Sequence, residues 1–171
     1  GKLTPNIESY PEGIIIPFDK PLEWTSADVV RKLKFKFQYF FRNKKLKVGH
    51  AGTLDPLATG MLIICLGKAT KISEQLQAEK KEYITDITFG ATTPSFDLEK
   101  EIDATYPYEH ITKGGIEEVL KNFIGEQQQV PPIFSAKYVD GVRAYEMARE
   151  GIEVELKSST INIYDVELLE Y

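Results

Sequence analysis

One segment of twelve residues, 49–60, constrains this chain more than any other. It holds three glycines, one proline and a single carboxylate, that of Asp55. Pro56 fixes its own φ and pushes Asp55 towards extended backbone, while glycines permit positive φ. An apolar run, Met61 to Leu66, follows at once. We therefore predict an irregular loop that holds one acid rigidly and leads into a buried strand.

The residues alone leave the role of Asp55 open. Asp-Pro is a common turn opener, so an ordinary turn is one interpretation. A single aspartate can also serve as a nucleophile, a general base, a metal ligand or an acceptor that caps a loop. Rigid loops that aim one reactive group are typical of active sites.

The segment resembles the signature of TruB-type tRNA pseudouridine synthases. That signature is approximately K-V-G-H-x-G-T/A-L-D-P-x-A-T-G, an apolar strand and then G-x-A-T-K, and residues 47–71 fill all of its positions. Two positions depart from the family pattern: Glu23 stands where a glycine is usual, and Tyr138 where a lysine is usual. Further segments match in the family's order: Asp19-Lys20-Pro21 with Thr25-Ser26, Glu82-Tyr83, Gly90-Ala91-Thr92-Thr93 with Ser95 and Asp97, residues 129–136, and residues 141–151.

The resemblance implies an isomerase that converts a uridine of tRNA to pseudouridine, at the T-arm position conventionally numbered 55, without cofactor or metal. Asp55 matches the family's essential catalytic residue, and attack on C1′ of the ribose or on C6 of the base both remain open. The target base has to be flipped out of an RNA loop. Tyr83 matches the tyrosine that stacks on this base, and its hydroxyl can help to remove the C5 proton.

The same resemblance gives a set of residues that contact the substrate RNA. For His50, packing within the loop is the alternative to RNA contact. Lys20 and Lys71 match lysines near the family's cleft, where they can bind phosphate or pair with a carboxylate. The predicted RNA-binding residues are His50, Lys20, Lys71, Asp97, Lys44 and Lys45.

Positive charge is concentrated in residues 31–47, although the net charge of the chain is −5. This basic segment has eight lysines and arginines, five interleaved aromatic residues and no acid. Segregated charge can build a phosphate-facing surface on an acidic protein. We expect its aromatic side chains to point into the core and its lysines to point outward.

The pattern of elements predicts an α+β protein. The resemblance adds the pseudouridine-synthase fold, a mixed and mostly antiparallel sheet with flanking helices and a central cleft. We expect a flexible N-terminal arm over residues 1–12 and a catalytic domain over residues 13–171. That domain is expected to be incomplete at its C-terminal end, because the family continues into strands with a Lys-Gly-Thr-Tyr-hydrophobic-Arg motif. Strands are expected at 13–18, 61–66, 81–89, 134–139, 152–156 and 159–169, and helices at 25–41, 67–77, 112–124 and 144–149.

Composition excludes several classes of protein. The chain has 171 residues, 42% of them hydrophobic, and its apolar runs are too short to span a membrane. A single cysteine excludes an internal disulfide and suits a reducing compartment. We expect a cytoplasmic monomer that binds tRNA, with no membrane and no metal. The alternatives are a dyskerin-type synthase that depends on a guide RNA, and a non-catalytic RNA-binding or folding module.

Overall fold

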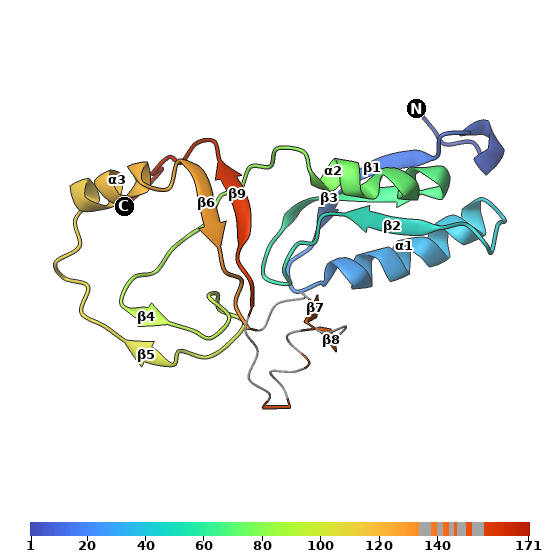
Figure 1. Cartoon of the computed structure of the whole chain (residues 1–171). Coiled ribbons are helices and arrows are strands. Elements are labelled where there is room, and N and C mark those ends of the chain that lie inside the picture. The colour runs from blue at the N-terminus through green and yellow to red at the C-terminus, as the bar shows by residue number, and fades with distance from the viewer. Residues whose placement is uncertain (134–137, 140–141, 144–145, 147–149, 152–155) are drawn as a thin grey trace. The chain divides into compact units, whose positions relative to one another are not determined.

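The computed structural model describes residues 1–133, 138–139, 142–143, 146, 150–151 and 156–171 (Figure 1). The chain divides into two compact units, Gly1–Ile84 and Thr85–Tyr171.

A three-stranded antiparallel sheet forms the centre of the first unit. Its strands are β1 (Ile14–Lys20), β2 (Val48–Ala51) and β3 (Gly60–Leu66), in the order β1-β3-β2. The central strand β3 is the predicted apolar run, and Leu62, Ile64, Cys65 and Leu66 are fully buried on it. The register pairs Lys20 at the end of β1 with Gly60 at the start of β3. Both residues therefore lie at the end of the strands from which the Asp55 loop emerges.

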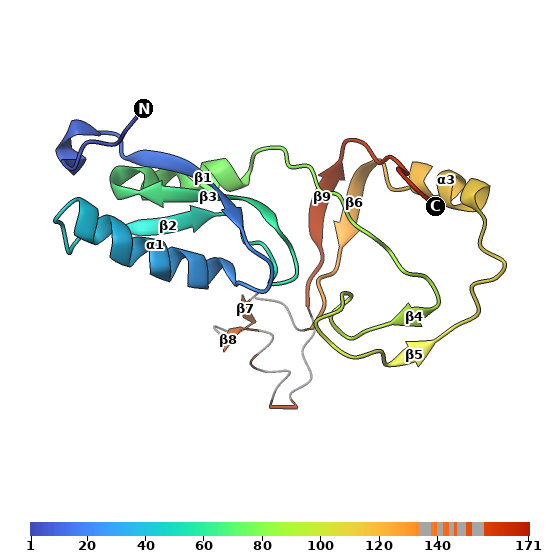
Figure 2. The same cartoon turned by 180° about the vertical axis from the view of Figure 1, so that it is seen from behind.

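The helix α1 (Ser26–Phe40) packs on this sheet, and Figures 1 and 2 both show it running along the strands. It begins with a capping box, in which the Thr25 side chain accepts from the Asp28 backbone and the Asp28 side chain accepts from the Thr25 backbone. Val29 and Phe41 join Leu62 in the hydrophobic core. The predicted amphipathic helix is confirmed.

The aromatic side chains of the basic segment divide between the two sides of α1. Phe37 packs against the core and Phe41 is buried within it, as predicted. Phe35 and Tyr39 are 76% and 83% exposed, so the expectation that all these rings point inward was wrong. The helical period explains the division, because residues 35 and 39 share one face and residues 37 and 41 share the opposite one.

The signature segment is less irregular than predicted. Residues 48–51 form β2 and pair with β3, for example Gly49 with Cys65 and His50 with Ile64. An extended segment can add to the open edge of a buried strand and satisfy its backbone there. The irregular loop is therefore confined to residues 52–59.

Short helices flank the sheet. The predicted helix at 67–77 is a 3-10 turn, η2 (Gly67–Ile72), followed by α2 (Ser73–Gln77). Near the N-terminus, η1 (Ile7–Ser9) precedes Tyr10, whose ring meets that of Phe41 edge-on at 6.3 Å. The flexibility of residues 1–12 stays a prediction, although Ile7 and Tyr10 pack against the core.

The second unit contains short antiparallel pairs and one helix. The strand β4 (Ala91–Thr92) pairs with β5 (Ala104–Thr105), and β6 (Gly125–Gln129) pairs with β9 (Ser159–Ile163). The two-residue strands β7 (Tyr138–Val139) and β8 (Val142–Arg143) also pair. With α3 (Lys113–Lys121), this combination of helices and antiparallel sheets confirms the α+β class.

Several predicted boundaries were wrong. Residues 81–89 form no strand, and Tyr83, Ile84 and Ile87 are 68%, 80% and 70% exposed. Alternating residues give a segment two faces, but a strand also needs a partner, and no described strand pairs with this one. The last strand ends at Ile163 and not at residue 169. The helix α3 ends at Lys121 and not at residue 124, and β6 begins at Gly125. Most residues of the elements expected at 134–139, 144–149 and 152–156 lie outside the described residues.

Candidate active site

The Asp55 loop, residues 52–59, leaves the sheet after β2 and returns to it at β3. Glycines bound it on both sides, Gly52 with φ of 91° and Gly60 with φ of 116°, conformations that favour glycine. The Asp55 carbonyl accepts a hydrogen bond from the Ala58 N–H at 3.0 Å and closes a turn. The residue itself is exposed, so the irregular loop that the sequence predicted presents one aspartate at the surface of the first unit.

Ser26, the first residue of α1, fixes the loop on one side of Asp55. Its Oγ donates to the Leu54 carbonyl at 3.0 Å and accepts from the Leu54 N–H at 2.9 Å. Ser26 is only 2% exposed, so water does not replace these bonds readily. The sequence contained this residue in the Thr25-Ser26 motif, but nothing in it indicated a contact across 28 positions.

The other side of Asp55 is held at the Pro56 carbonyl. This oxygen accepts from the Glu23 N–H at 2.7 Å and from the Lys20 Nζ at 3.3 Å. Glu23 has φ of 67°, which is costly for a residue with a side chain. This backbone conformation explains why glycine suits the position. The backbone on both sides of Asp55 is therefore hydrogen-bonded to residues that run from the end of β1 (Lys20) through Glu23 to the start of α1 (Ser26).

Lys20 lies in the interior and not at the surface where phosphate contact was expected. It is fully buried, and its ammonium group also donates to the carbonyls of Pro21 at 3.0 Å and Trp24 at 2.6 Å. An ammonium group has three N–H donors, and a buried charge is tolerated only when it is hydrogen-bonded. In this conformation Lys20 supports the Asp55 loop through its hydrogen bond to the Pro56 carbonyl. Its buried ammonium group is not accessible to RNA. Residue type alone does not reveal such burial.

His50 lies on β2, next to the start of the Asp55 loop, and is partly buried. Its Nδ1 is enclosed and has no hydrogen-bond partner in the described part of the chain. Burial lowers the pKa of its imidazole, and a backbone hydrogen bond with Gly52 opposes this only in part. Burial therefore favours the neutral ring in the protein without RNA, and this form can offer hydrogen bonding or stacking to RNA.

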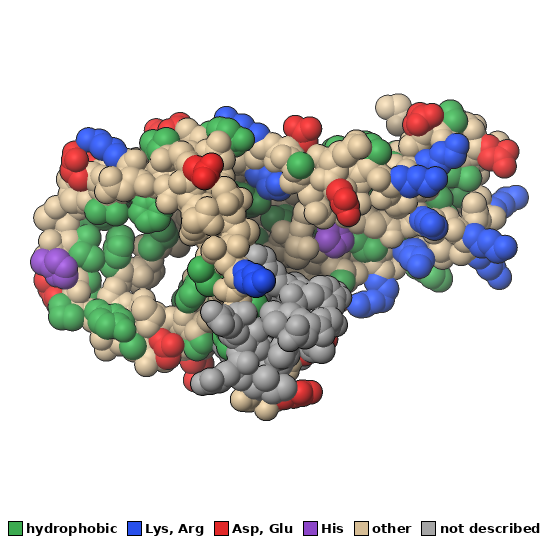
Figure 3. Space-filling model, in the orientation of Figure 1, with side chains coloured by type: hydrophobic (Ala, Val, Ile, Leu, Met, Phe, Trp, Pro, Cys, Tyr) green, Lys and Arg blue, Asp and Glu red, His purple; other side chains and the backbone are tan. Residues whose placement is uncertain are grey.

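Two predicted RNA contacts, Lys45 and Lys71, lie around one hollow of about 490 Å³ between η1 and η2. Lys47 and Lys68 also line this hollow, and Glu8 is the acid among its described lining residues. Lys44 is exposed in the same connection between α1 and β2 but does not line it. Figure 3 shows lysine and arginine side chains gathered at this end of the first unit. Four ammonium groups around one hollow suit a phosphate-bearing ligand.

Tyr83 and Asp97 are not joined to Asp55 by any contact that the structure describes. Tyr83 is 68% exposed, near the end of the first unit. Asp97 lies in the second unit, in the loop between β4 and β5. Its Oδ1 accepts from the Glu99 N–H at 2.9 Å, and its carbonyl accepts from the hydroxyls of Thr93 and Ser95. The functions of Tyr83 and Asp97 stay predictions.

Neither a metal site nor a membrane-spanning helix occurs in the described ranges. These ranges contain no cluster of three or more His, Cys, Asp or Glu side chains that could hold a metal ion. No helix among these residues is long and apolar enough to cross a lipid bilayer. Cys65 is buried on β3, and burial raises the pKa of its thiol, which fits packing better than nucleophilic chemistry.

Comparison with known proteins defines the family. Residues 38–171 match the N-terminal domain of the TruB family pseudouridylate synthases. The chain belongs to this family. A tRNA pseudouridine synthase B of Phocaeicola vulgatus is 59% identical to this TruB-family chain over 162 residues, which are 95% of the chain and 69% of the relative. The enzyme of the same name from Fusobacterium nucleatum is 45% identical over 160 residues, 94% of the chain and 53% of the relative.

A solved structure supports the fold independently. In the crystal structure of a Cbf5-Nop10-Gar1 complex, one protein chain matches the TruB-family chain with a TM-score of 0.56 and 24% sequence identity. The match covers 96% of this chain and 38% of the other. At that identity it shows a shared fold, which is the pseudouridine-synthase fold expected from the sequence.

Proposed function

We propose that this TruB-family chain converts a uridine of tRNA to pseudouridine, that the target is uridine 55 of the T-arm, and that Asp55 is the catalytic residue. The relatives named tRNA pseudouridine synthase B, at up to 60% identity among those compared, support the reaction and the tRNA substrate. One observation carries the choice of Asp55: its carboxylate is exposed while the residues on both sides of it are hydrogen-bonded to buried groups.

The reaction breaks the bond between N1 of the base and C1′ of the ribose and forms a bond between C5 and C1′. The proton leaves C5 and N1 becomes protonated, so no electron acceptor or activated group is consumed. A carboxylate oxygen of Asp55 can act as the nucleophile, at C1′ or at C6. The protein must therefore hold one carboxylate against a base that has been flipped out of the RNA.

The loop geometry suits this task. Catalysis by a positioned group requires near-attack geometry, and a displacement of about 1 Å can cost about a hundredfold in rate. The bonds from Ser26 to Leu54 and from Lys20 to Pro56 fix the backbone to either side of Asp55. They leave the carboxylate itself free to meet the substrate.

The remaining predicted site residues have auxiliary roles in this proposal. Tyr83 stacks on the flipped base, the neutral ring of His50 contacts the RNA loop, and Asp97 contacts the RNA near the target. Lys45 and Lys71 bind phosphate at the hollow that they line, and Lys44 adds charge beside it. The likeness to the chain of the Cbf5-Nop10-Gar1 complex concerns the fold alone, so it does not favour a mechanism that depends on a guide RNA. We further propose that the enzyme works as a cytoplasmic monomer.

The test replaces Asp55 by Asn, which keeps the shape of the side chain and removes its charge. Release of tritium from tRNA containing 5-tritiated uridine should disappear, while the dissociation constant for tRNA stays within a few-fold of the wild type. The control is Asp86→Asn, which changes another exposed aspartate and should leave both quantities unchanged. Near-normal tritium release by Asp55→Asn would overturn the assignment.

A further inference from the structure

Two aromatic side chains stand on the outer face of α1 without packing against the core. Phe35 is 76% exposed and Tyr39 is 83% exposed. They are four residues apart, so they are neighbours on the same helix face. Exposing two large rings side by side is unfavourable in water, and such a pair is a candidate contact for a partner.

Cations surround these two rings. Arg31 and Lys32 lie one turn before Phe35 on the helix surface, and Lys36 lies one turn before Tyr39. All three are exposed. We call these five residues, Arg31, Lys32, Phe35, Lys36 and Tyr39, the outer stripe.

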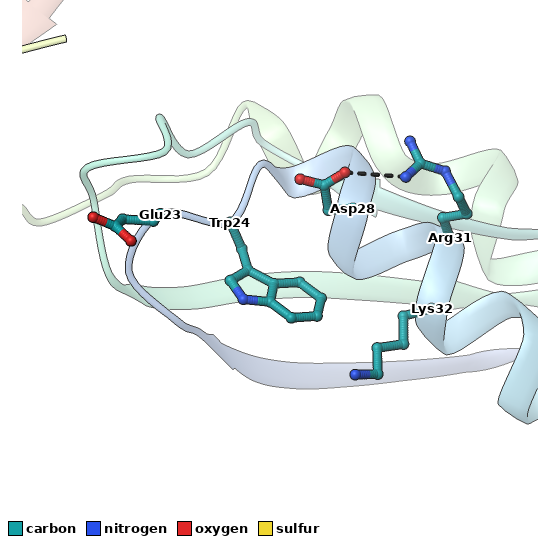
Figure 4. Close-up of a pocket in the computed structure, with 5 residues that line it drawn as sticks. All are labelled: Glu23, Trp24, Asp28, Arg31 and Lys32. Atoms are coloured by element: carbon teal, nitrogen blue, oxygen red, sulfur yellow. Dashed lines mark hydrogen bonds and ion pairs between the residues drawn. The ribbon is translucent and has the colours of Figure 1, made fainter.

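The N-terminal end of the outer stripe adjoins a third aromatic ring. Lys32 Nζ lies 4.9 Å from the centre of the Trp24 ring, and these two residues line an open hollow with Glu23, Asp28 and Arg31 (Figure 4). Asp28 is the acid on this face of α1, and it is engaged with Arg31 at 3.1 Å. The sequence has no acidic residue from Arg31 to Lys47.

The outer stripe extends away from the Asp55 loop. Ser26, which bonds to Leu54 in that loop, is the first residue of α1, and Tyr39 lies near its last. At a rise of about 1.5 Å per residue, the outer stripe reaches about 20 Å from the Asp55 loop along the helix axis. A folded RNA that places one base at Asp55 is large enough to reach along this distance.

We propose that the outer stripe is a second contact for the tRNA substrate, at which unpaired bases stack on Phe35 and Tyr39 while the flanking cations hold phosphates. This rests on the proposed function for the identity of the RNA. Flat aromatic faces beside positive charge are the elements with which proteins bind single-stranded nucleic acid. A duplex would use the cations but not the rings, and a second copy that docked through its own outer stripe would bring the same positive charge against this one.

The test compares two double variants of the protein. Phe35→Leu with Tyr39→Leu keeps the apolar bulk and the helix propensity but removes the flat rings. Phe35→Tyr with Tyr39→Phe keeps both rings and serves as the matched control. Dissociation constants are measured by fluorescence anisotropy for an unmodified tRNA transcript, a short oligoadenylate and a blunt RNA duplex of the same length. Circular dichroism establishes that each variant is folded.

The leucine variant should bind tRNA and oligoadenylate at least about fivefold more weakly, as expected for the loss of one stacked base. Its affinity for the duplex, and the affinity of the ring-exchange control for all three RNAs, should not change. Normal binding of tRNA and oligoadenylate by the leucine variant would overturn the proposal and leave a protein partner as the occupant. An equal loss for the duplex would overturn stacking as the cause.

The proposed function fails independently of this result. If the wild-type protein binds oligoadenylate through the outer stripe but releases no tritium from tRNA, the isomerase assignment is wrong and the stacking surface stands. If the leucine variant isomerises and binds tRNA as the wild type does, the assignment stands and the stacking surface is wrong.

Discussion

The Asp55 loop and the Asp97 loop differ in what holds them. Groups distant in sequence hold the first, since Ser26 and Lys20 reach it across 28 and 36 positions and both are buried. The described bonds at Asp97 come from Thr93, Ser95 and Glu99, at most four positions away. All fully buried hydrophobic side chains in the described part of the chain lie in the first unit. A loop anchored to a packed core can aim a reactive group, whereas a locally bonded loop has freedom to adapt to a ligand.

The largest structural effect is expected at Lys20. Lys20→Met keeps most of the side chain's volume but removes the lysine donor from the carbonyls of Pro21 and Trp24, and one of two donors from the Pro56 carbonyl. The free energy of unfolding, measured in urea, should fall by about 2–3 kcal/mol, because hydrogen bonds from a buried charged group are strong. Lys44→Met, at an exposed lysine, should change it by less than about 0.5 kcal/mol. The rate of isomerisation by the folded variant should fall only slightly, because the Pro56 carbonyl keeps its hydrogen bond from the Glu23 N–H.

Ser26 and Ser95 provide the most direct contrast between the two loops. Ser26→Ala leaves the partly buried N–H and carbonyl of Leu54 without their partner, which should cost about 1–2 kcal/mol of stability. It should also slow single-turnover tritium release by loosening the loop. Ser95→Ala removes a longer bond of 3.4 Å in a less buried place and should change stability by less than about 0.5 kcal/mol. Equal effects of the two substitutions would contradict the distinction drawn between the loops.

A smaller effect is expected from pH. Burial lowers the pKa of His50 in the folded protein, so between that value and the ordinary value of about 6.5 the unfolded chain binds more protons. The free energy of unfolding should therefore rise with pH through this window, and the contribution of His50 to it should be lost as pH falls below about 6.5. His50→Gln should flatten the dependence in this range, and His110→Gln, at an exposed histidine, should not. The measurement is urea unfolding at several pH values from 5 to 8.

The sequence predicted the parts of the site that depend on local rules. Glycine and proline placed the Asp55 loop, the apolar run placed β3, and the helix expected at 25–41 agrees with α1 to within one residue at each end. It did not predict the bonds that hold the loop, because Ser26 and Lys20 approach it only after the chain has folded. Lys20 was expected near the cleft, bound to phosphate or paired with a carboxylate, and residues 81–89 were expected to form a strand. Burial and strand pairing, however, are properties of the tertiary structure. Phe35 and Tyr39 were misplaced because a count of aromatic residues does not assign them to a helix face.

The central claim is that the Asp55 carboxylate performs the chemistry, whereas Asp97 contacts the RNA. It is tested most directly by single-turnover tritium release, at saturating enzyme, for Asp55→Ala and Asp97→Ala. The account predicts no detectable release for Asp55→Ala, with tRNA still bound. For Asp97→Ala it predicts a higher concentration of enzyme at half-saturation and a maximal rate within about tenfold of the wild type. Measurable turnover by Asp55→Ala, or complete loss of turnover by Asp97→Ala alone, would contradict it.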